Sequence, residues 1–453
     1  MSTLQAGFGR VNVNPMMGID ISGYYQVRKA DGILDDLEAN AIAFSLDNKK
    51  IVMVCVDALG FSKELMDEMR ASVSEKFGIT KESVFISATH THTGPAASLR
   101  RGEELTDLQV EYIAFLKKRV VDAVQFALDD LKPAKMGWGI GQAHRVAFVR
   151  RFRMKDGSVK TNPGVNNPEI EGPIGDVDER VNVLRFDREG ADSLVLVNFG
   201  NHPDVVGGCK ISSDWPGFVR RTVEKAIDGT KCIFFNGAQG DVNHVNVNPV
   251  GGEMNEMFID FDDVARGYAH ARYIGRVIAG SVLQVYDKVK YVDVDSMQAI
   301  EQNMKVAANK GTPEELVEAK RIHALHTEGR DDELPYKGMM LTTVVAAAGR
   351  MVRLENGPDY FEIPLSGIQL GPVAFVGIPG EPFTGIGRGL KEAEEFDMVL
   401  PVCCTNGYEG YYPMQDSYDE GGYEAGTSRF KAGTAEQIIR EGRELLTKLG
   451  GNA

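Results

Sequence analysis

Histidines and acidic residues gather where short apolar segments end. Four of the eight histidines follow such segments, together with two carboxylates and a tyrosine. These residues are His90, His92, His202, Asp241, His244, Glu381 and Tyr411. Ligands of α/β proteins bind beyond the carboxyl ends of strands. If the strands share one sheet and one direction, the loops converge. Because zinc takes imidazole nitrogen and carboxylate oxygen as ligands, the pattern predicts a metal site.

The spacing inside the first loop suits metal binding. In His90-Thr91-His92 two imidazoles lie on one side of an extended segment, because side chains alternate with a period of two. Either both bind one metal, or one binds while the other acts on the substrate. Glu381 follows Pro379-Gly380 and precedes a predicted helix, which holds its carboxylate at a loop corner. Zinc and other divalent ions both remain possible, since availability and geometry select the metal.

Each candidate also has a structural interpretation when it is taken alone. A single loop histidine more often packs in a turn than binds a metal, and Glu381 would suit the first turn of a helix. The joint placement at strand ends favours the metal site. His323 and His326 share a helix face but lie in a charged segment, so we expect them, like His144 and His270, to be structural.

A local basic cluster stands out in an otherwise acidic chain. It consists of Arg150, Arg151 and Arg153. One interpretation is the solvated face of a strand. The other is an anchor for a substrate carboxylate or for the oxyanion that develops during acyl transfer.

Short β-rich runs alternate with longer helical patterns along the chain. The strands are expected at residues 50–57, 83–87, 181–186, 193–199, 232–235, 373–377 and 398–403. The helices are expected at 62–76, 107–130, 218–226, 263–285, 312–327, 384–393 and 434–449. This alternation predicts an α/β fold, with α+β as the alternative, in which helices cover the faces of a layered mixed sheet. We expect one domain over residues 1–453, with a helical insertion around 293–349.

The composition excludes several classes of protein. The 453 residues include 50 basic and 65 acidic side chains, for a formal net charge of −15. This balance argues against a nucleic-acid partner and against stable membrane association. The chain has no apparent signal peptide and no apolar run long enough to span a bilayer. Its five cysteines form no C-x-x-C pair. We therefore expect a cytoplasmic protein with reduced thiols.

Several segments resemble motifs of one enzyme family, the neutral (alkaline, non-lysosomal) ceramidases. The stretch AGFGRVNVNP, the run IVMVCVDALG and the segment SATHTHTGP are similar to the family's start and to its zinc motif. Further matches are NFGNHPDVVGG with SSDWPGF, FFNGAQGDVN, GIPGEPFTGIGRGL and TNGYEGYYPMQDSYDEGGYEAGTS. In the last segment Thr427 stands where the family has Ser. The resemblance extends from about residue 5 to residue 430.

The resemblance implies a role for individual residues. Zinc would be bound by His90, His202, Glu381 and Tyr411. His92 would assist the substrate or the transition state, and Arg150 is the best match to the family's active-site arginine. Tyr411 also belongs to the catalytic set. We assign His244, Asp241 and Tyr418 to contacts with substrate.

Two departures from the family's pattern bear on the substrate. Asn243 replaces the active-site Ser that follows G-D-V, and an amide can only form hydrogen bonds where a hydroxyl could lose a proton. Asn243 would therefore position substrate or water. The chain also shows neither a signal peptide nor the family's C-terminal β-sandwich. We expect a zinc hydrolase of an amide bond in a soluble small molecule. The alternatives are a lactonase, esterase or deacetylase, or a non-catalytic ligand-binding protein.

Overall fold

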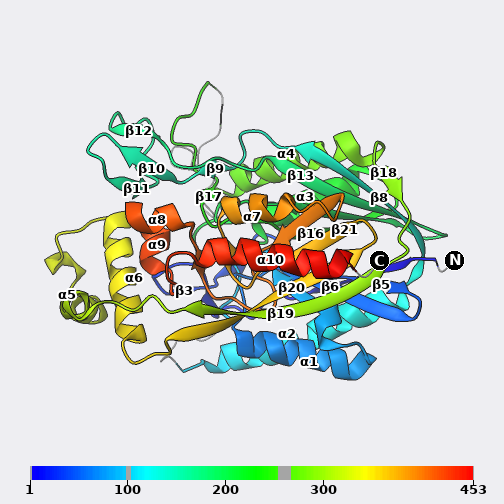
Figure 1. Ribbon diagram of the computed structural model, residues 1–453, viewed down its shortest axis with the longest axis horizontal. Coiled ribbons are helices and arrows are strands. Elements are labelled where there is room, and N and C mark those ends of the chain that lie inside the picture. The colour runs from blue at the N-terminus through cyan, green and yellow to red at the C-terminus, as the bar shows by residue number, and fades with distance from the viewer. Residues whose placement is uncertain (1–2, 98–103, 252, 254–266, 452–453) are drawn as a thin grey trace.

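The protein is built of four layers, in which two β-sheets pack face to face between two layers of helices (Figure 1). The computed structural model describes residues 3–97, 104–251, 253 and 267–451. The large sheet has the order β16 (Thr230–Asn236), β14 (Ser193–Phe199), β13 (Arg180–Arg188), β8 (Lys132–Gln142), β1 (Gln5–Asn12), β5 (Glu38–Leu46), β6 (Lys49–Val56) and β7 (Val84–Ala88), and β18 (Lys290–Val292) pairs with β8. The small sheet has the order β19 (Met297–Ala307), β20 (Tyr360–Leu370), β21 (Val373–Gly377) and β23 (Met398–Val402).

Alternation along each strand divides the core into layers. One face of the large sheet contacts the small sheet, through residues such as Phe44, Phe235 and Phe375. Its other face is covered by α1 (Lys63–Phe77) and α2 (Asp107–Asp129) on one half, and by α3 (Asp214–Ala226) and α4 (Tyr268–Tyr286) on the other. The outer face of the small sheet packs on α7 (Thr384–Lys391) and α10 (Thr434–Gly450). The predicted layered α/β fold is confirmed.

The large sheet is nearly divided in two. Strands β1 and β8, at its centre, pair over two residue pairs only, Gln5 with Pro133 and Ala6 with Lys132. Its two outermost strands nevertheless approach each other, since the rings of Phe85 on β7 and Phe235 on β16 lie 6.4 Å apart between centroids. This curvature brings together the ends of strands that are far apart in the sheet order.

Three parallel strand pairs direct their carboxyl ends to one end of the molecule. They are β6 with β7, β14 with β16, and β21 with β23, whereas the other pairs of the two sheets are antiparallel. Two short parallel strands, β22 (Glu381–Pro382) and β24 (Tyr411–Tyr412), then join the loops that follow β21 and β23. The expected strands are all present, to within a few residues at their ends.

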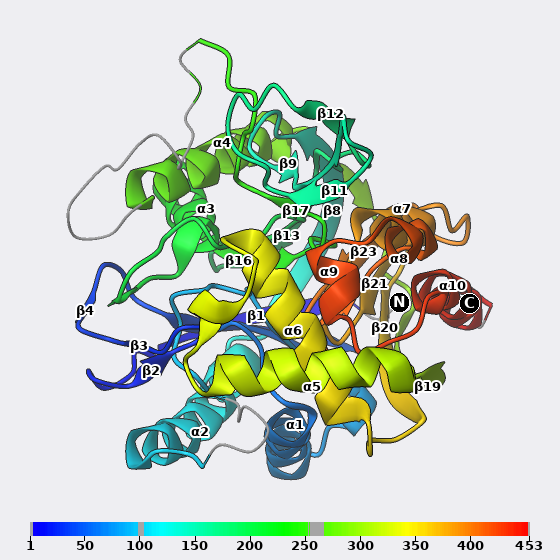
Figure 2. The same cartoon turned by 90° about the vertical axis from the view of Figure 1, so that its left-hand side faces the viewer.

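The region expected to be a helical insertion differs in its first part. Residues 297–307 form β19, which runs antiparallel along the whole of β20 and completes the small sheet. Helices follow only in α5 (Pro313–Thr327) and α6 (Met339–Leu354), at the end of the molecule that faces the viewer in Figure 2. Thr312 and Glu315 form a capping box at the start of α5. The prediction was wrong for β19 because its residues alternate between polar and apolar types without a long apolar run.

The remaining elements are short or lie near the strand ends. They include α8 (Gln415–Glu420), α9 (Tyr423–Thr427), β9 (Phe148–Val149), β10 (Arg151–Met154), β17 (Val242–Asn243), β15 (Lys210–Ile211) and β4 (Gly32–Ile33). The helix expected at 263–285 begins at Tyr268 in the structure, and residues 263–266 lie outside the described part of the chain.

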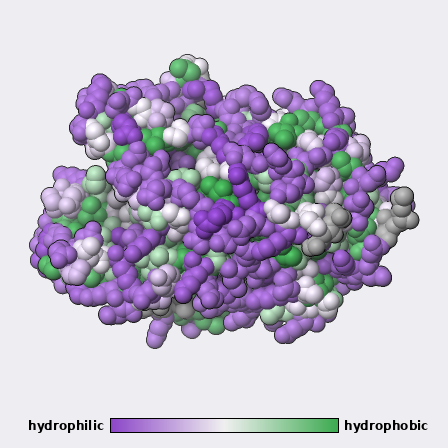
Figure 3. Space-filling model, viewed as in Figure 1, coloured by the Kyte–Doolittle hydropathy of each residue, from purple (hydrophilic) through white to green (hydrophobic). Residues whose placement is uncertain are grey.

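The visible surface is largely hydrophilic, with apolar residues scattered in small groups (Figure 3). Among the described residues, we find no helix with the length and apolar character needed to cross a bilayer.

Candidate metal centre

Loops that follow five strands meet at one end of the two sheets. His90 and His92 follow β7, His202 follows β14 and Glu381 follows β21. The loop after β16 contributes Gln239, and the loop after β23 leads to Tyr411. The five strands do not share one sheet, which the sequence-based expectation required. They belong to two facing sheets, and the loops converge because the parallel pairs of both sheets end on the same side.

Three imidazoles and one carboxylate come together in this region. The ligand atoms of His90, His92 and His202, here called the histidine cluster, lie within 4.8 Å of one another. Oε2 of Glu381 lies 3.2 Å from Nε2 of His90 and 3.1 Å from Nε2 of His202. All four side chains are buried. The spacing is compact enough for one ion to contact several of these atoms at once.

Backbone carbonyls fix how two of the imidazoles are turned. Nδ1 of His90 lies 2.7 Å from the carbonyl oxygen of Leu59, and Nδ1 of His202 lies 3.0 Å from that of Gln239. A carbonyl only accepts hydrogen bonds, so each Nδ1 carries the proton and each Nε2 presents its lone pair. Carbonyl contacts of this kind orient histidines that bind metals.

Both lone pairs face a carboxylate, and that of His90 also lies 3.4 Å from Nε2 of His92. Nε2 of His202 has no hydrogen-bond partner among the described residues, although Glu381 is close. Burial raises the pKa of Glu381, but positive charge at the Nε2 atoms of His90 and His202, from a proton or from a metal ion, opposes this effect and holds the pKa well below its usual value. Lone pairs next to an ionised carboxylate repel each other unless a cation lies between them. The residues therefore fit a divalent metal ion.

His90 is held in a strained backbone conformation. Its φ is 73°, in the left-handed region that residues other than glycine rarely adopt. Its N–H donates to the carbonyl oxygen of Ala58 at 2.8 Å. Strain of this kind persists where surrounding contacts determine the conformation, and it is common at functional sites.

His92 differs from the other two imidazoles because its second nitrogen faces an acidic side chain. Its Nε2 is 3.4 Å from Nε2 of His90, and its Nδ1 is 3.6 Å from Oδ1 of Asp204. Burial first, and then the neighbouring His90 and His202, lower the pKa of His92 well below its usual value. A neutral imidazole can accept a proton at neutral pH.

Arg150 lies beside the cluster, as expected from the sequence. Its Nε donates to Oε1 of Glu424 at 2.6 Å, and its Nη2 donates to the carbonyl oxygen of Gly240 at 2.6 Å. Its guanidinium carbon is 5.2 Å from the centre of the Tyr411 ring, which stacks on His202 at 6.4 Å. Burial lowers the pKa of Arg150, but Tyr411 and Glu424 raise it by more than this. The pKa therefore lies above its usual value, and the guanidinium stays charged.

Two residues of the loop after β16 use their polar atoms to support the loop and its surroundings. Oδ1 of Asp241 accepts hydrogen bonds from the backbone N–H and the hydroxyl of Thr384, at 2.7 and 2.8 Å. Asn243 accepts from the N–H of Val245 at 3.0 Å and donates to the side chain of Asn162 at 3.3 Å. Asp241 thus secures the start of α7, three residues after Glu381.

Two other predicted site residues contact groups outside the cluster. The ring of His244 packs against that of His270, with centroids 5.8 Å apart. The hydroxyl of Tyr418 donates to Oγ of Ser428 at 3.1 Å and to the carbonyl oxygen of Phe430 at 2.7 Å. Tyr418 reaches the site only indirectly, because Ser428 in turn donates to the carbonyl oxygen of Tyr411.

Besides Asp204, sequence reasoning missed four residues around Glu381, Arg150 and Tyr411. Tyr408 donates to Oε1 of Glu381 at 2.5 Å, and Gln239 donates to Oε2 at 3.5 Å. Glu424 holds Arg150, and the ring of Tyr423 lies 5.7 Å from that of Tyr411. A signal was present, because all four lie inside segments that resemble the family's motifs.

Fold and site together define a class of protein. The site is a buried set of two carbonyl-oriented histidines, a third histidine and a carboxylate, with an arginine beside it, and such a set could hold a metal ion. A family model described as neutral/alkaline non-lysosomal ceramidase, N-terminal, matches residues 5–252. The chain belongs to this family, which acts on amide bonds.

Individual relatives agree with this assignment. A neutral ceramidase of Mycobacterium tuberculosis is 22% identical over 455 residues, which cover 89% of this chain and 70% of the relative. Neutral ceramidase A of Dictyostelium discoideum is 25% identical over 272 residues, which cover 55% of this chain and 36% of the relative.

Solved structures share the fold. The crystal structure of neutral ceramidase from Pseudomonas aeruginosa has a TM-score of 0.73 at 17% identity, and the match covers 100% of this chain and 75% of that one. A structure described as ceramidase complexed with C2 has a TM-score of 0.70 at 15% identity, with 99% of this chain and 75% of that chain covered.

Proposed function

We propose that this protein is a zinc-dependent hydrolase that cleaves an amide bond in a soluble small molecule. One observation carries the proposal. Nε2 of His90 and Nε2 of His202 both present lone pairs to the carboxylate of Glu381, at 3.2 and 3.1 Å. His90, His202 and Glu381 would hold the metal, with Tyr411 as the fourth ligand. Such an ion polarises the substrate carbonyl and lowers the pKa of water toward about 7.

The residues around these ligands have distinct tasks in the proposed reaction. His92 lies beside His90, and no backbone carbonyl of the described residues bonds to its Nδ1, so it would accept the proton that the attacking water loses and pass it to the leaving nitrogen. Arg150 remains charged and lies next to Tyr411. Both stabilise the carbonyl oxygen as negative charge develops on it. Because Glu424 and Gly240 already fix the guanidinium, little reorganisation is needed in the transition state.

Asn243 suggests that water is the nucleophile. Its side chain carries no hydroxyl, and its amide bonds to Val245 and Asn162 within the loop. We assign it to the shape of the pocket wall and to positioning of substrate or water. His244 and Asp241 lie in the same loop, and we propose that they contact the substrate.

The soluble substrate is supported by charge. A net charge of −15 opposes docking on the anionic surfaces from which a lipid would be taken. We therefore expect short N-acyl amines or N-acyl amino acids to be better substrates than a long-chain N-acyl sphingoid base. The same argument supports action away from membranes, in the cytoplasm.

A second candidate is hydrolysis of an ester or a lactone, or removal of an acetyl group, by the same site. It is favoured by Asn243 in place of the family's Ser, since a changed residue beside the reacting bond suits a different leaving group. Ester carbonyls also react more readily than amide carbonyls. The ligands and the roles of His92 and Arg150 would be unchanged.

The test is to purify the full chain, determine its metal content and measure hydrolysis on a matched panel. The panel contains amides of short and long acyl chains, and the corresponding esters and lactones. We expect about one zinc ion per chain and faster turnover of short amides. His90→Ala should lose both metal and activity. A protein without stoichiometric metal, or full activity in His90→Ala, would overturn the proposal. Metal-loaded protein that binds panel compounds without turnover would favour a non-catalytic role.

A further inference from the structure

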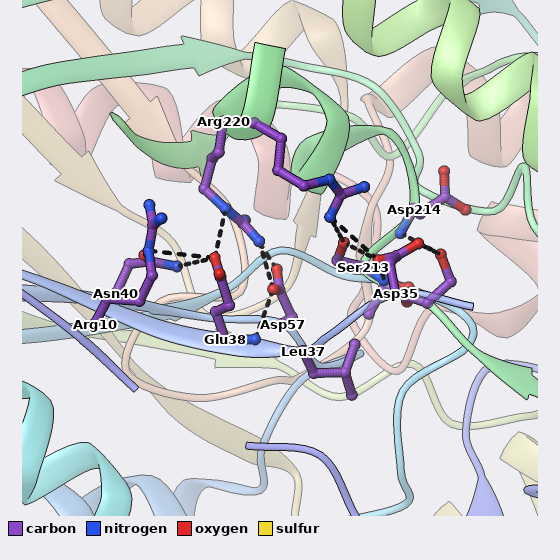
Figure 4. Close-up of polar contacts among 12 residues, drawn as sticks. Arg10, Asp35, Leu37, Glu38, Asn40, Asp57, Ser213, Asp214 and Arg220 are labelled. Atoms are coloured by element: carbon purple, nitrogen blue, oxygen red, sulfur yellow. Dashed lines mark hydrogen bonds and ion pairs between the residues drawn. The ribbon is translucent and has the colours of Figure 1, made fainter. Parts of the chain in front are cut away.

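Buried polar groups in helix α3 and just before it contact residues that neighbour the three histidines. Figure 4 shows Arg220 beside Asp57 and Glu38, and Ser213 beside Asp35. We propose that α3 positions the histidine cluster, with Arg220 fixing His90 through Asp57 and Asp214 fixing His202 through its loop. The inference rests on the proposed function in one respect, namely that the cluster holds a metal ion. Neither Arg220 nor Asp214 contacts the cluster itself, so both would be positioning residues.

Arg220 and Asp57 form a bidentate ion pair in the interior. Nη1 and Nη2 of Arg220 donate to Oδ1 and Oδ2 of Asp57, at 3.0 and 2.6 Å. Both side chains are almost completely buried. Nε of Arg220 lies 3.2 Å from a carboxylate oxygen of Glu38, whose backbone N–H also donates to Asp57. Two fixed partners and a planar fork leave the Asp57 carboxylate one orientation.

Asp57 immediately precedes Ala58 and Leu59, the two residues whose backbone carbonyls accept hydrogen bonds from His90. The next two carbonyls in the chain, those of Ala58 and Leu59, accept from the N–H and from Nδ1 of His90, at 2.8 and 2.7 Å. These two contacts maintain the strained φ of His90 and select its tautomer. A shift of Asp57 would therefore move both acceptors and turn the imidazole away from Glu381.

Asp214, at the start of the same helix, holds the second histidine loop. Its Oδ2 accepts from the N–H groups of Val205 and Val206, at 3.0 and 2.9 Å. Its Oδ1 accepts from the N–H of Trp215, whose indole N–H donates to the carbonyl oxygen of His202 at 3.2 Å. Asp214 is fully buried and has a φ of 54°. The strain and the three backbone donors indicate that this carboxylate is specifically required.

The residues just before Asp214 hold the loop that carries His92. The hydroxyls of Thr91 and Thr93 both donate to the carbonyl oxygen of Ser212, at 2.8 and 3.1 Å. Ser212 is itself fixed by Asp35, to which its hydroxyl donates at 2.8 Å. One segment, Ser212 to Arg220, thus reaches the surroundings of His90, His92 and His202.

A purely structural role is the competing explanation. A buried ion pair is a weak source of stability, because desolvation cancels much of the attraction. Stability alone would thus be equally served by apolar residues. What these contacts have in common is that they orient the imidazoles. Replacing a residue that orients a metal ligand typically weakens metal affinity about 10–100-fold.

The test uses the full-length protein and three variants. Arg220→Lys keeps the charge but not the bidentate geometry, and Asp214→Asn keeps one acceptor and tolerates a positive φ. Arg70→Lys is the matched control. Arg70 is equally buried, pairs with Glu301 at 2.7 Å and donates to the carbonyl oxygen of Val84, at the opposite end of β7 from His90. The readouts are Co²⁺ affinity from its visible absorption spectrum and amide hydrogen exchange of the metal-free chain.

The proposal predicts effects confined to particular loops. Arg220→Lys should accelerate exchange at His90, Asp214→Asn at Val205 and Val206, and both should weaken Co²⁺ binding about 10–100-fold. Arg70→Lys should change neither. Unchanged affinity with uniform acceleration along the chain, or no change at all, would overturn the proposal. If the wild-type protein binds no Co²⁺ but the loop-specific exchange pattern is found, the proposed function fails and the positioning role is retained.

Discussion

In two imidazoles of the histidine cluster, those of His90 and His202, one ring nitrogen is fixed by a hydrogen bond and the other faces Glu381. His90 and His202 both use Nδ1 for a backbone carbonyl, whereas His92 has Asp204 beside its Nδ1, at 3.6 Å. This difference separates two possible ligand sets. His90 and His202 belong to both, and His92 competes with Glu381 for the third place. The carbonyl contacts favour His90, His202 and Glu381 as ligands, with His92 left for proton transfer.

The first prediction distinguishes these sets by substitution. His90→Ala should lose metal and activity together. His92→Ala should retain the metal and lose about 10²–10⁴-fold in kcat, the usual effect of removing a general acid–base group. Metal content and kcat of both purified variants provide the measurement. Loss of the metal in His92→Ala would instead make His92 a ligand.

A second prediction at this scale concerns His270 and the pH dependence of stability. Burial lowers the pKa of His270 to about 4, from an ordinary value of 6.5. The unfolded chain therefore binds a proton below pH 6.5 that the folded chain still rejects. The stabilisation by neutral His270 is present above pH 6.5 and is lost as the pH falls toward 4. A shift of this size corresponds to about 3 kcal/mol.

Urea unfolding at pH 7 and pH 4 of the wild type and of His270→Gln would measure this loss. We expect the wild type to lose about 3 kcal/mol more than the variant over this interval. Equal losses in the two proteins would show that His270 is accessible to protons in the folded state.

The residue types of the site could be predicted from the sequence, but their partners could not. Histidines after apolar runs are visible in the sequence, and so is Glu381 after Pro-Gly. Glu424 follows no apolar run and is marked only by the family-like segment around it, because its partner Arg150 is 274 positions away in the chain. The contacts of α3 are equally hidden, since Arg220 and Asp57 are separated by 163 positions.

At the scale of elements, the loops between strands and helices determine the site. The pairing of β22 with β24 places Glu381 opposite Tyr411. It depends on Gly380, which has a φ of 148° and whose place leaves no room for a side chain. A Cβ there would lie 2.4 Å from the carbonyl oxygen of Gly410.

The third prediction follows from this close approach. Gly380→Ala should displace Glu381 and reduce metal affinity as well as stability, because both the backbone angle and the space exclude a methyl group. Gly280→Ala is the control. Gly280 lies within α4, and none of the described residues comes within 4 Å of the place that an added methyl group would take, so alanine should stabilise that helix by about 0.5–1 kcal/mol. Thermal unfolding and zinc titration of both variants measure these effects. Normal zinc affinity in Gly380→Ala would contradict the argument.

The strands that could be predicted most closely from the sequence are those with a nearly uninterrupted apolar run. Strands β6, β14 and β21 consist of nearly uninterrupted apolar residues, and their limits were expected to within a residue. Strand β8 was missed, because three glycines, at 137, 139 and 141, break its pattern. These glycines allow α4 and β18 to pack closely, for a Cβ at Gly141 would lie 2.3 Å from the hydroxyl of Ser281. Such a requirement belongs to packing and leaves no local signal.

At the scale of the whole molecule, the space between the two sheets forms one continuous core. It includes side chains from every strand between β16 and β7 in the large sheet and from all four strands of the small sheet. The site depends on this packing, since His90 follows a strand of one sheet and Glu381 follows a strand of the other. Loss of contact between the sheets would therefore separate His90 from Glu381.

The last prediction tests whether the two sheets unfold together. Phe375 on β21 is fully buried between them. Phe375→Ala should cost about 3–5 kcal/mol, the usual range for a large aromatic residue in a core. Because the core is shared, far-UV circular dichroism, aromatic fluorescence and release of bound zinc should all shift to the same lower temperature. Such coincidence is the mark of one cooperative unit. A variant in which zinc release and loss of secondary structure separate into two transitions would show that the sheets are independent, and would divide the single domain expected from the sequence.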